Sequence, residues 1–353
     1  MAIPQNLISL YETRTMLPFI ELNPGAPTPL RDAVFTNTRL FDSKKIDIEV
    51  IKRGREVPNY CKSIESGDLV EHEGYNSFTY EAPYVHEYLH IKPEDFDFKQ
   101  IGETPYNYTP PEQQVTNRLN RDYTTLDTRY NRLEERQAVE LITTGALTPY
   151  DKKGNAFPTI DFGVQTSHKP VLTGTAKWND ASATKNSIIA QLVLWNTDLL
   201  VKDGTHNVRQ IWMGRAAKNA LINALDPDNS YAGFNSIDAS RGSLDLTPLP
   251  EGISRVGRLR ELGDIPMFCY VGWYKDRTGT VVQMFPENLV VMVGSGRYDR
   301  NYGRIENFNA PSKIARFPWI WRDPKGKGIE THLETSPLLS IYEPDDLVIA
   351  TVC

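Results

Sequence analysis

The chain has 353 residues, of which 24% are charged and 40% hydrophobic, and its formal net charge is −6. These proportions are typical of a globular protein, and the negative balance gives no support to wrapping of nucleic acid by bulk charge. No stretch approaches the ~18 apolar residues of a membrane-spanning helix, and the first ten residues lack the features of a secretion signal. The widely spaced Cys61, Cys269 and Cys353 predict reduced thiols rather than a disulfide framework or a metal cluster.

The first ninety residues predict an arm followed by a long ribbon. Residues 1–32 are expected to be extended, because the prolines between Asn23 and Pro29 disfavour regular structure. Residues 46–54 and 78–91 alternate apolar and polar side chains as strands do, and the polar segment 55–77 separates them. An isolated two-stranded ribbon is only marginally stable in water, so we expect this one to rest on another surface.

A single long helix is predicted from Thr109 to Gly145. Thr109 and Glu112 form a capping-box pattern, prolines occupy the first helical positions, and Gly145 is a typical residue for the end. At about 1.5 Å per residue the helix spans on the order of 50 Å, more than a compact domain needs. A helix of this length with one narrow apolar face favours an architectural protein over an enzyme.

The side chains of this helix separate into arcs when each residue is turned by about 100°. Five arginines fall within an arc of about 80°: Arg118, Arg121, Arg129, Arg132 and Arg136. The neighbouring arc is apolar and contains Val115, Leu119, Tyr123, Leu126, Tyr130 and Leu133. We expect the apolar arc to face a sheet of the same chain, which leaves the arginine arc on a flank that needs a partner or water.

The rest of the chain predicts short strands and two further helices. The helices are expected at 184–200 and 215–225. The strands are expected at 157–163, 208–212, 267–274, 280–285, 289–293, 314–321, 329–341 and 347–352, with a turn at 323–326.

One segment matches a zinc-protease motif. His86-Glu87-Tyr88-Leu89-His90 has the H-e-x-x-H spacing, which serves zinc only where a helix places both histidines on one face. Here it lies between Pro83 and Pro93 among β-favouring residues, so we interpret it as a strand. A zinc metalloprotease remains the distant alternative.

Other catalytic signatures are weak. Asp276-Arg277-Thr278-Gly279-Thr280 is similar to the phosphorylated loop of cation pumps, but its Asp and Gly suit a hairpin turn. Gly294-Ser295-Gly296 lacks the third glycine and the helix of a dinucleotide site. We therefore assign no catalytic, cofactor-binding or metal-binding residues and expect no enzymatic role.

Four segments resemble the major capsid proteins of tailed bacteriophages, of the lambda-type or E-family. They are Glu81–Val85, Ala138–Gly145, Phe285–Gly294 and Ser336–Leu347, in that order along the chain. The resemblance implies an α+β fold of the Hong Kong 97 type. It also implies a subunit, found in the virion, that self-assembles through hexamers and pentamers into the icosahedral shell around double-stranded DNA. An encapsulin-like nanocompartment shell is the alternative on the same fold.

The resemblance also implies a division of the chain. The N-arm and lead-in take residues 1–43 and the E-loop 44–92. The P-domain takes 93–165, with its spine helix at 110–144, and returns at 310–341. The A-domain takes 166–309, and the C-terminal strand 342–353 is expected to join it.

Partners follow from the same resemblance. The shell implies contacts with other copies, a separate scaffolding protein, a portal protein, non-specific contact with packaged DNA and optionally a decoration protein. Because the family's E-loop lies over an adjacent subunit, its acidic tip is predicted to meet a neighbour's arginine stripe. The tip residues are Glu56, Glu65, Asp68, Glu71 and Glu73. A solvated helix face and contact with DNA are the alternatives for these arginines.

Overall fold

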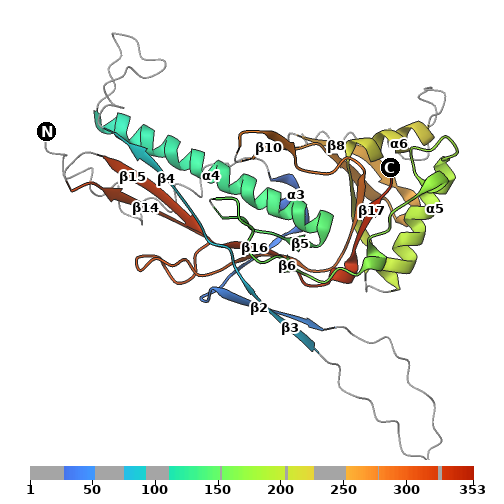
Figure 1. Ribbon diagram of the computed structural model, residues 1–353, viewed down its shortest axis with the longest axis horizontal. Helices are drawn as coiled ribbons and strands as arrows, with labels where there is room; N and C mark the ends of the chain where they lie inside the picture. Colours follow the sequence, from blue (N-terminus) through green and yellow to red (C-terminus); the bar gives the residue numbers. More distant parts are fainter. Residues whose placement is uncertain are drawn as a thin grey trace, which may run out of the picture.

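The computed structural model describes eight stretches of the chain: residues 28–51, 75–92, 111–151, 153–202, 206–225, 252–276, 278–324 and 328–353. The four α-helices within them are α3 (Pro29–Val34), α4 (Pro111–Thr144), α5 (Lys185–Trp195) and α6 (Arg215–Leu225). Figure 1 shows α4 running along the molecule, from a sheet at one end toward the end that carries α5 and α6. None of the helices described is both long and apolar enough to cross a membrane.

A five-stranded sheet lies at the end that carries α5 and α6. Its strands follow the order β17-β12-β7-β9-β8, and only β7 and β9 are parallel. They are β7 (Val208–Met213), β8 (Ile253–Leu259), β9 (Ile265–Tyr270), β12 (Leu289–Gly294) and β17 (Leu347–Thr351). The C-terminal strand β17 pairs with β12 and so forms an edge of this sheet.

Both faces of this sheet are covered. Because side chains alternate along a strand, Val290 and Met292 of β12 pack in one core cluster with α5 and α6. Val291 and Val293 point to the opposite face and pack in a second cluster with the C-terminal part of α4. The continuous apolar sequence of β12 is that of a strand buried on both faces.

A second, antiparallel sheet lies under the N-terminal half of α4 (Figure 1). It has the order β14-β15-β4 and consists of β4 (Val85–Ile91), β14 (Arg316–Arg322) and β15 (Ile329–Thr335). A third sheet, of order β1-β13-β16, connects the two ends of the molecule. It consists of β1 (Asn37–Leu40), β13 (Tyr298–Tyr302) and β16 (Pro337–Ile341).

A two-stranded ribbon projects from the body in Figure 1. It consists of β2 (Lys45–Ile51) and β3 (Tyr75–Glu81), with Ile51 opposite Tyr75 at its outer described end. Its base is anchored, because Ile46 and Ile48 are buried in the main core. The tip between the strands, including Glu56, Glu65, Asp68, Glu71 and Glu73, lies outside the described residues.

The described residues also form several short elements. The strands β5 (Ala146–Leu147) and β6 (Ile160–Asp161) form one pair, and β10 (Trp273–Lys275) and β11 (Val281–Gln283) form another. A π-helical turn at Asn196–Val201 continues α5. The 3-10 turns are Thr166–His168, Gly174–Ala176, Arg260–Leu262 and Pro344–Asp346.

Several sequence predictions need correction. The strand expected at 78–91 is two strands in different sheets, because Ala82 is buried and Pro83 has no N–H to donate. The strand expected at 329–341 likewise splits at Ser336 into β15 and β16, and that expected at 157–163 is only the two-residue β6. Residues 29–34 form the helix α3 rather than an extended arm, since proline suits a first helical turn.

Candidate functional site

The long helix α4 presents three different faces, and the first is apolar. Leu119 and Tyr123 are buried in a cluster with Ile91 of β4 and with the flanking Ile320 and Ile329. Farther along, Leu126 and Tyr130 pack with Leu333, Val85 and Leu89. The prediction that the apolar arc faces a sheet of the same chain is therefore confirmed for these four residues.

The second face is polar, buried and was not predicted. The side chains of Asp127, Asn131, Glu134 and Glu135 are at most 7% exposed. With Arg118 at zero, Asp127, Asn131 and Glu134 lie at roughly 180°, 220° and 160°, opposite the arginine arc, and Glu135 lies at roughly 260°, between them and that arc. The buried surface of α4 is therefore wider than the apolar arc alone, because acidic and amide side chains can also be buried when cations are supplied from elsewhere.

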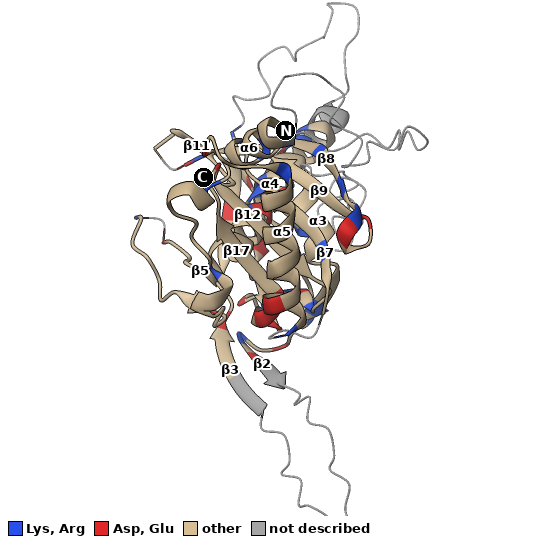
Figure 2. Ribbon diagram, turned by 90° about the vertical axis from the view of Figure 1, so that its right-hand side faces the viewer, with Lys and Arg blue, Asp and Glu red and all other residues tan. Residues whose placement is uncertain are grey.

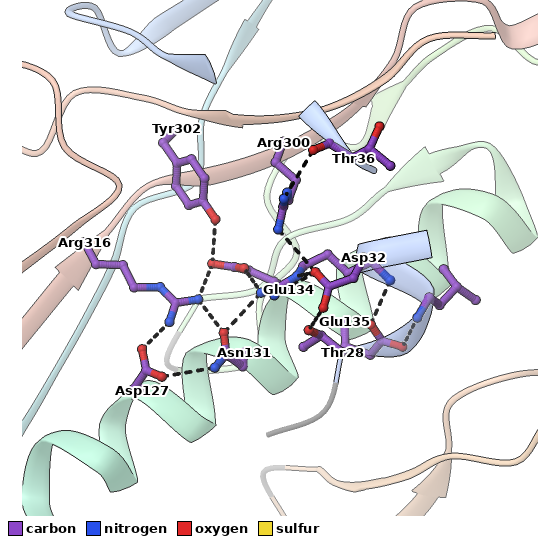
Figure 3. A network of polar contacts seen from close by, with 12 residues as sticks. Thr28, Asp32, Thr36, Asp127, Asn131, Glu134, Glu135, Arg300, Tyr302 and Arg316 are labelled. Carbon is purple, nitrogen blue, oxygen red and sulfur yellow. Dashed lines mark hydrogen bonds and ion pairs between the residues drawn. The ribbon is translucent and has the colours of Figure 1, made fainter. Parts of the chain in front are cut away.

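Two arginines supply those cations, Arg316 and Arg31, and Figure 3 labels Arg316 with its partners Asp127, Asn131 and Glu134. Arg316 of β14 donates to Glu134 Oε1 at 2.8 Å and to Asn131 Oδ1 at 2.7 Å, and it forms an ion pair with Asp127. Arg31 of α3 forms an ion pair with the other oxygen of Glu134. The Tyr302 hydroxyl of β13 donates to Glu134 Oε1 at 3.1 Å. Glu134 thus connects α4 to three other elements.

Burial and charge act in opposite directions on Arg316. Burial lowers the pKa of its guanidinium, but the attraction of Glu134 and Asp127 outweighs it, so the pKa is raised. Arg31 shows the same balance. Both side chains therefore stay charged at any physiological pH.

Glu135 caps the short helix α3. Its two carboxylate oxygens accept hydrogen bonds from the backbone N–H groups of Leu30, at 3.1 Å, and Arg31, at 2.9 Å. These N–H groups belong to the first turn of α3 and have no partner within that helix. Burial raises the pKa of Glu135, and the two backbone hydrogen bonds oppose that shift. Residues 28–34 are therefore fixed on the long helix.

The third face carries the predicted arginines, and three of the five have partners in their own chain. Arg129 makes a bidentate pair with Glu87 of β4, at 2.6 and 2.7 Å. Arg118 lies 3.4 Å from Asp122, one helical turn away. The guanidinium of Arg136 lies over the rings of Tyr150 and Tyr274, at 5.9 and 5.3 Å from the ring centres.

Arg121 and Arg132 differ from these three. Both side chains are exposed. Among the residues that the structure describes, neither forms an ion pair. These two arginines are the part of the predicted stripe that is available to another molecule.

The H-e-x-x-H segment is strand β4, as predicted. Four strand residues separate His86 from His90 by about 13 Å, too far for both to bind one metal ion. His86 Nε2 instead lies 2.9 Å from His332 Nδ1 of β15, and His90 Nδ1 lies 3.4 Å from Glu330. Since Glu87 is held by Arg129, the segment has the contacts of a structural strand.

The aspartate loop is a hairpin turn, also as predicted. Asp276 Oδ1 accepts hydrogen bonds from the backbone N–H groups of Thr278 and Thr280, both at 2.9 Å, and the loop joins β10 to β11. The Thr278 hydroxyl also donates to this carboxylate. The hydroxyl bond, and then the backbone bonds, lower the pKa of Asp276. The carboxylate therefore organises the turn.

Comparison with known sequences identifies relatives along nearly the whole chain. The profile of the family described as phage major capsid protein E matches residues 12–352. The P21 prophage-derived major head protein of Escherichia coli O6:H1 (strain CFT073) is 22% identical over 374 residues, covering 98% of this chain and all of the relative. The major capsid protein of Enterobacteria phage P21 matches with the same identity and coverage.

Solved structures give the same fold. A prophage capsid protein from E. coli CFT073 superimposes with a TM-score of 0.72 at 17% identity, covering 97% of this chain and 99% of that one. The capsid of Ralstonia phage GP4 gives a TM-score of 0.51 at 11% identity, covering 87% and 83%. The fold is therefore that of Hong Kong 97-type capsid proteins. Together with the family match over residues 12–352, it establishes that this chain belongs to the phage major capsid protein E family and is a major capsid protein, a component of the virion.

Proposed function

We propose that this capsid protein forms rings of five and six copies, which close into an icosahedral shell around phage DNA. The observation that carries the proposal is the family match from residue 12 to residue 352, joined to a subunit whose ribbon extends away from its body (Figure 1). A pair of strands alone is marginally stable, so its outer part requires a surface that another copy can supply.

We assign the parts of the subunit from the strand pairing. The E-loop takes residues 44–81 rather than 44–92, because β4 pairs with β15 beneath the long helix. The A-domain takes the five-stranded sheet with α5 and α6, and it ends near residue 296, because β13 pairs with β1 and β16. The P-domain then contains α4 and the sheet β14-β15-β4.

Exposed apolar side chains are candidates for burial against other copies. Contiguous apolar patches mark contact surfaces, whereas single exposed apolar residues are common on any protein. Those more than half exposed include Phe157, Val171, Trp273, Val281 and Phe308. They lie outside the main core clusters, on loops and on the β10–β11 hairpin.

We further propose that the acidic tip of one subunit's E-loop lies against Arg121 and Arg132 of a neighbour. These arginines are exposed, whereas Arg118, Arg129 and Arg136 already have intramolecular partners. The tip residues Glu56, Glu65, Asp68, Glu71 and Glu73 supply the opposite charge. Each exposed pair contributes only ~0–1 kcal/mol, but the contact is repeated throughout a shell.

Charge reversal tests this contact. Arg121→Glu with Arg132→Glu should reduce the yield of closed shells several-fold in electron micrographs, and adding Glu71→Lys with Glu73→Lys should restore part of it. Lys153→Glu with Lys202→Glu makes the same change of charge at two exposed sites away from the helix and should assemble normally. Normal assembly of the arginine variant, or failure of the rescue, would contradict the assignment.

Other partners are expected from the class of protein. A separate scaffolding protein and a portal protein would direct closure, and a decoration protein could bind outside. Lys, Arg, Asp and Glu are scattered over the described chain in the view of Figure 2, so contact with packaged DNA is proposed as weak and non-specific. We expect no catalytic turnover, since assembly is carried by surface area.

A further inference from the structure

Three segments meet where the five-stranded sheet joins the sheet β1-β13-β16. His206 precedes β7, Gly294–Gly296 connects β12 to β13, and Glu343–Asp346 connects β16 to β17. The last two segments carry the chain from one sheet to the other. Their position means that any bond between them fixes the orientation of the two sheets.

A cluster of ligand-type side chains occupies this junction. The donor atoms of His206, Glu343 and Asp346 all lie within 4.8 Å of one another. His206 Nδ1 is 2.5 Å from Asp346 Oδ2 and 3.3 Å from Glu343 Oε2. The Asp346 side chain is 1% exposed, whereas Glu343 and His206 are about two-fifths exposed, at 42% and 38%.

The backbone around the cluster leaves room for these oxygens. A Cβ at Gly296 would lie 2.4 Å from Asp346 Oδ2 and 2.8 Å from Glu343 Oε2. A Cβ at Gly294 would lie 2.8 Å from the carbonyl oxygen of Asp346. The close atom at Gly294 belongs to the backbone, and those at Gly296 are the two carboxylate oxygens, so a side chain at Gly296 would push both carboxylates aside.

Two carboxylates and one imidazole meet at this point. Glu343 Oε2 is enclosed yet makes no hydrogen bond among the described residues. The nearby guanidinium of Arg297 is held by Asp299 at 2.7 Å and stacks on Tyr342, so it is engaged elsewhere.

We infer that His206, Glu343 and Asp346 bind a divalent transition-metal ion of the zinc class, which clamps the two sheets together at their junction. One imidazole nitrogen and two carboxylate oxygens are a donor set that suits zinc, with water at the fourth position. Ligand oxygens and nitrogens lie about 2.0–2.2 Å from zinc. For both to bind one zinc ion, His206 Nδ1 and Asp346 Oδ2, which are 2.5 Å apart, must therefore move apart by less than about 1 Å. The half-exposed side chain of His206 has room for this movement.

Zinc titration of the full-length, tag-free chain after treatment with EDTA tests the site. Calorimetry should give one zinc per chain. Zinc should raise the melting temperature by about 3 °C or more, while magnesium at the same concentration should not. Absence of zinc binding, or an equal effect of magnesium, would overturn the inference.

Variants assign the binding to these residues. Glu343→Gln and His206→Gln should each weaken zinc binding at least tenfold. His86→Gln with His90→Gln, which alters the histidines of β4, should leave it unchanged. If His206→Gln fails to fold, the test depends on Glu343→Gln, because the Glu343 side chain is half-exposed and its replacement disturbs the fold less. Unchanged affinity in that variant, or loss of binding in the β4 double variant, would place any zinc elsewhere and contradict the site.

Discussion

At the scale of single residues, Glu134 joins the long helix to three other elements. It is fully buried, forms ion pairs with Arg31 and Arg316, and accepts a hydrogen bond from Tyr302. These three partners come from three other elements. A buried carboxylate between two buried guanidinium groups is stable only while all partners remain. Glu134 therefore determines whether α3, β13 and β14 can pack on the long helix.

Replacing Glu134 with glutamine should destabilise the subunit strongly. The change keeps the size but leaves Arg31 and Arg316 with too little negative charge, which should lower the free energy of unfolding by about 3 kcal/mol. Urea unfolding followed by tryptophan fluorescence measures it. Glu261→Gln, an exposed position, is the control and should unfold as the wild type does. Equal midpoints for the two variants would contradict this account of the network.

A second residue-scale prediction concerns pH. Burial, and then the neighbouring His86, lower the pKa of His332 from its ordinary value of 6.5, although Glu330 and Glu334 oppose this. The unfolded chain then binds the proton more readily. The contribution of the neutral His332 to the free energy of unfolding is therefore present above pH 6.5, and it is lost as the pH falls through the lowered native pKa.

His332→Gln should therefore reduce the loss of melting temperature between pH 7.5 and pH 5 relative to the wild type. His90→Gln removes a more exposed imidazole that also faces Glu330, and it should keep most of the wild-type dependence. The same pH dependence in His332→Gln as in the wild type would show that His332 does not cause it.

At the scale of elements, the long helix shows what sequence could predict and what it could not. Its extent to Gly145 and its apolar arc follow from local patterns, and so do α5, α6 and most strands. The buried acidic face was missed because its partners, Arg31 and Arg316, lie far away in the sequence. The split of 78–91 into β3 and β4 was also missed: Pro83 marks the break, but the different partners of the two strands, β2 for β3 and β15 for β4, are set by pairing between distant segments. The arginine stripe could be located, but its partners within the chain could not.

The end of the helix gives a test at this scale. Gly145 has φ +78°, and a Cβ there would lie 2.6 Å from Val164 Cγ2. Gly163 has nearly the same φ, +77°, but a Cβ would meet nothing within 4 Å. Gly163→Ala should lower the free energy of unfolding by the ~1–3 kcal/mol of backbone strain alone. Gly145→Ala should lower it by more, because the new methyl group also meets Val164. Equal losses of melting temperature in the two variants would mean that Val164 moves aside without loss of packing and would contradict this prediction.

At the scale of the whole molecule, the subunit consists of a body with a large buried core and a ribbon that projects from it (Figure 1), and we propose that the ribbon packs on another copy. The body has two large buried clusters, one on each face of the five-stranded sheet. Within the described residues, the ribbon is anchored at its base by the buried Ile46 and Ile48. Folding and assembly should therefore depend on different parts of the chain.

Shortening the ribbon tests that separation. Residues 52–74 can be replaced by an Asn-Gly turn joining Ile51 to Tyr75, which already face each other across the two strands. The variant should remain a folded monomer with nearly unchanged thermal stability, but its yield of closed shells should fall at least tenfold. Loss of folding would place the segment in the core and contradict the assignment of the E-loop.

The most direct test of the central claim is electron cryo-microscopy of the chain co-expressed with the proteins encoded beside it. The account predicts closed icosahedral shells built from rings of five and six copies, with each ribbon lying across the long helix of a neighbour. A chain that stays monomeric under every assembly condition, or shells in which the ribbon folds back on its own subunit, would contradict it.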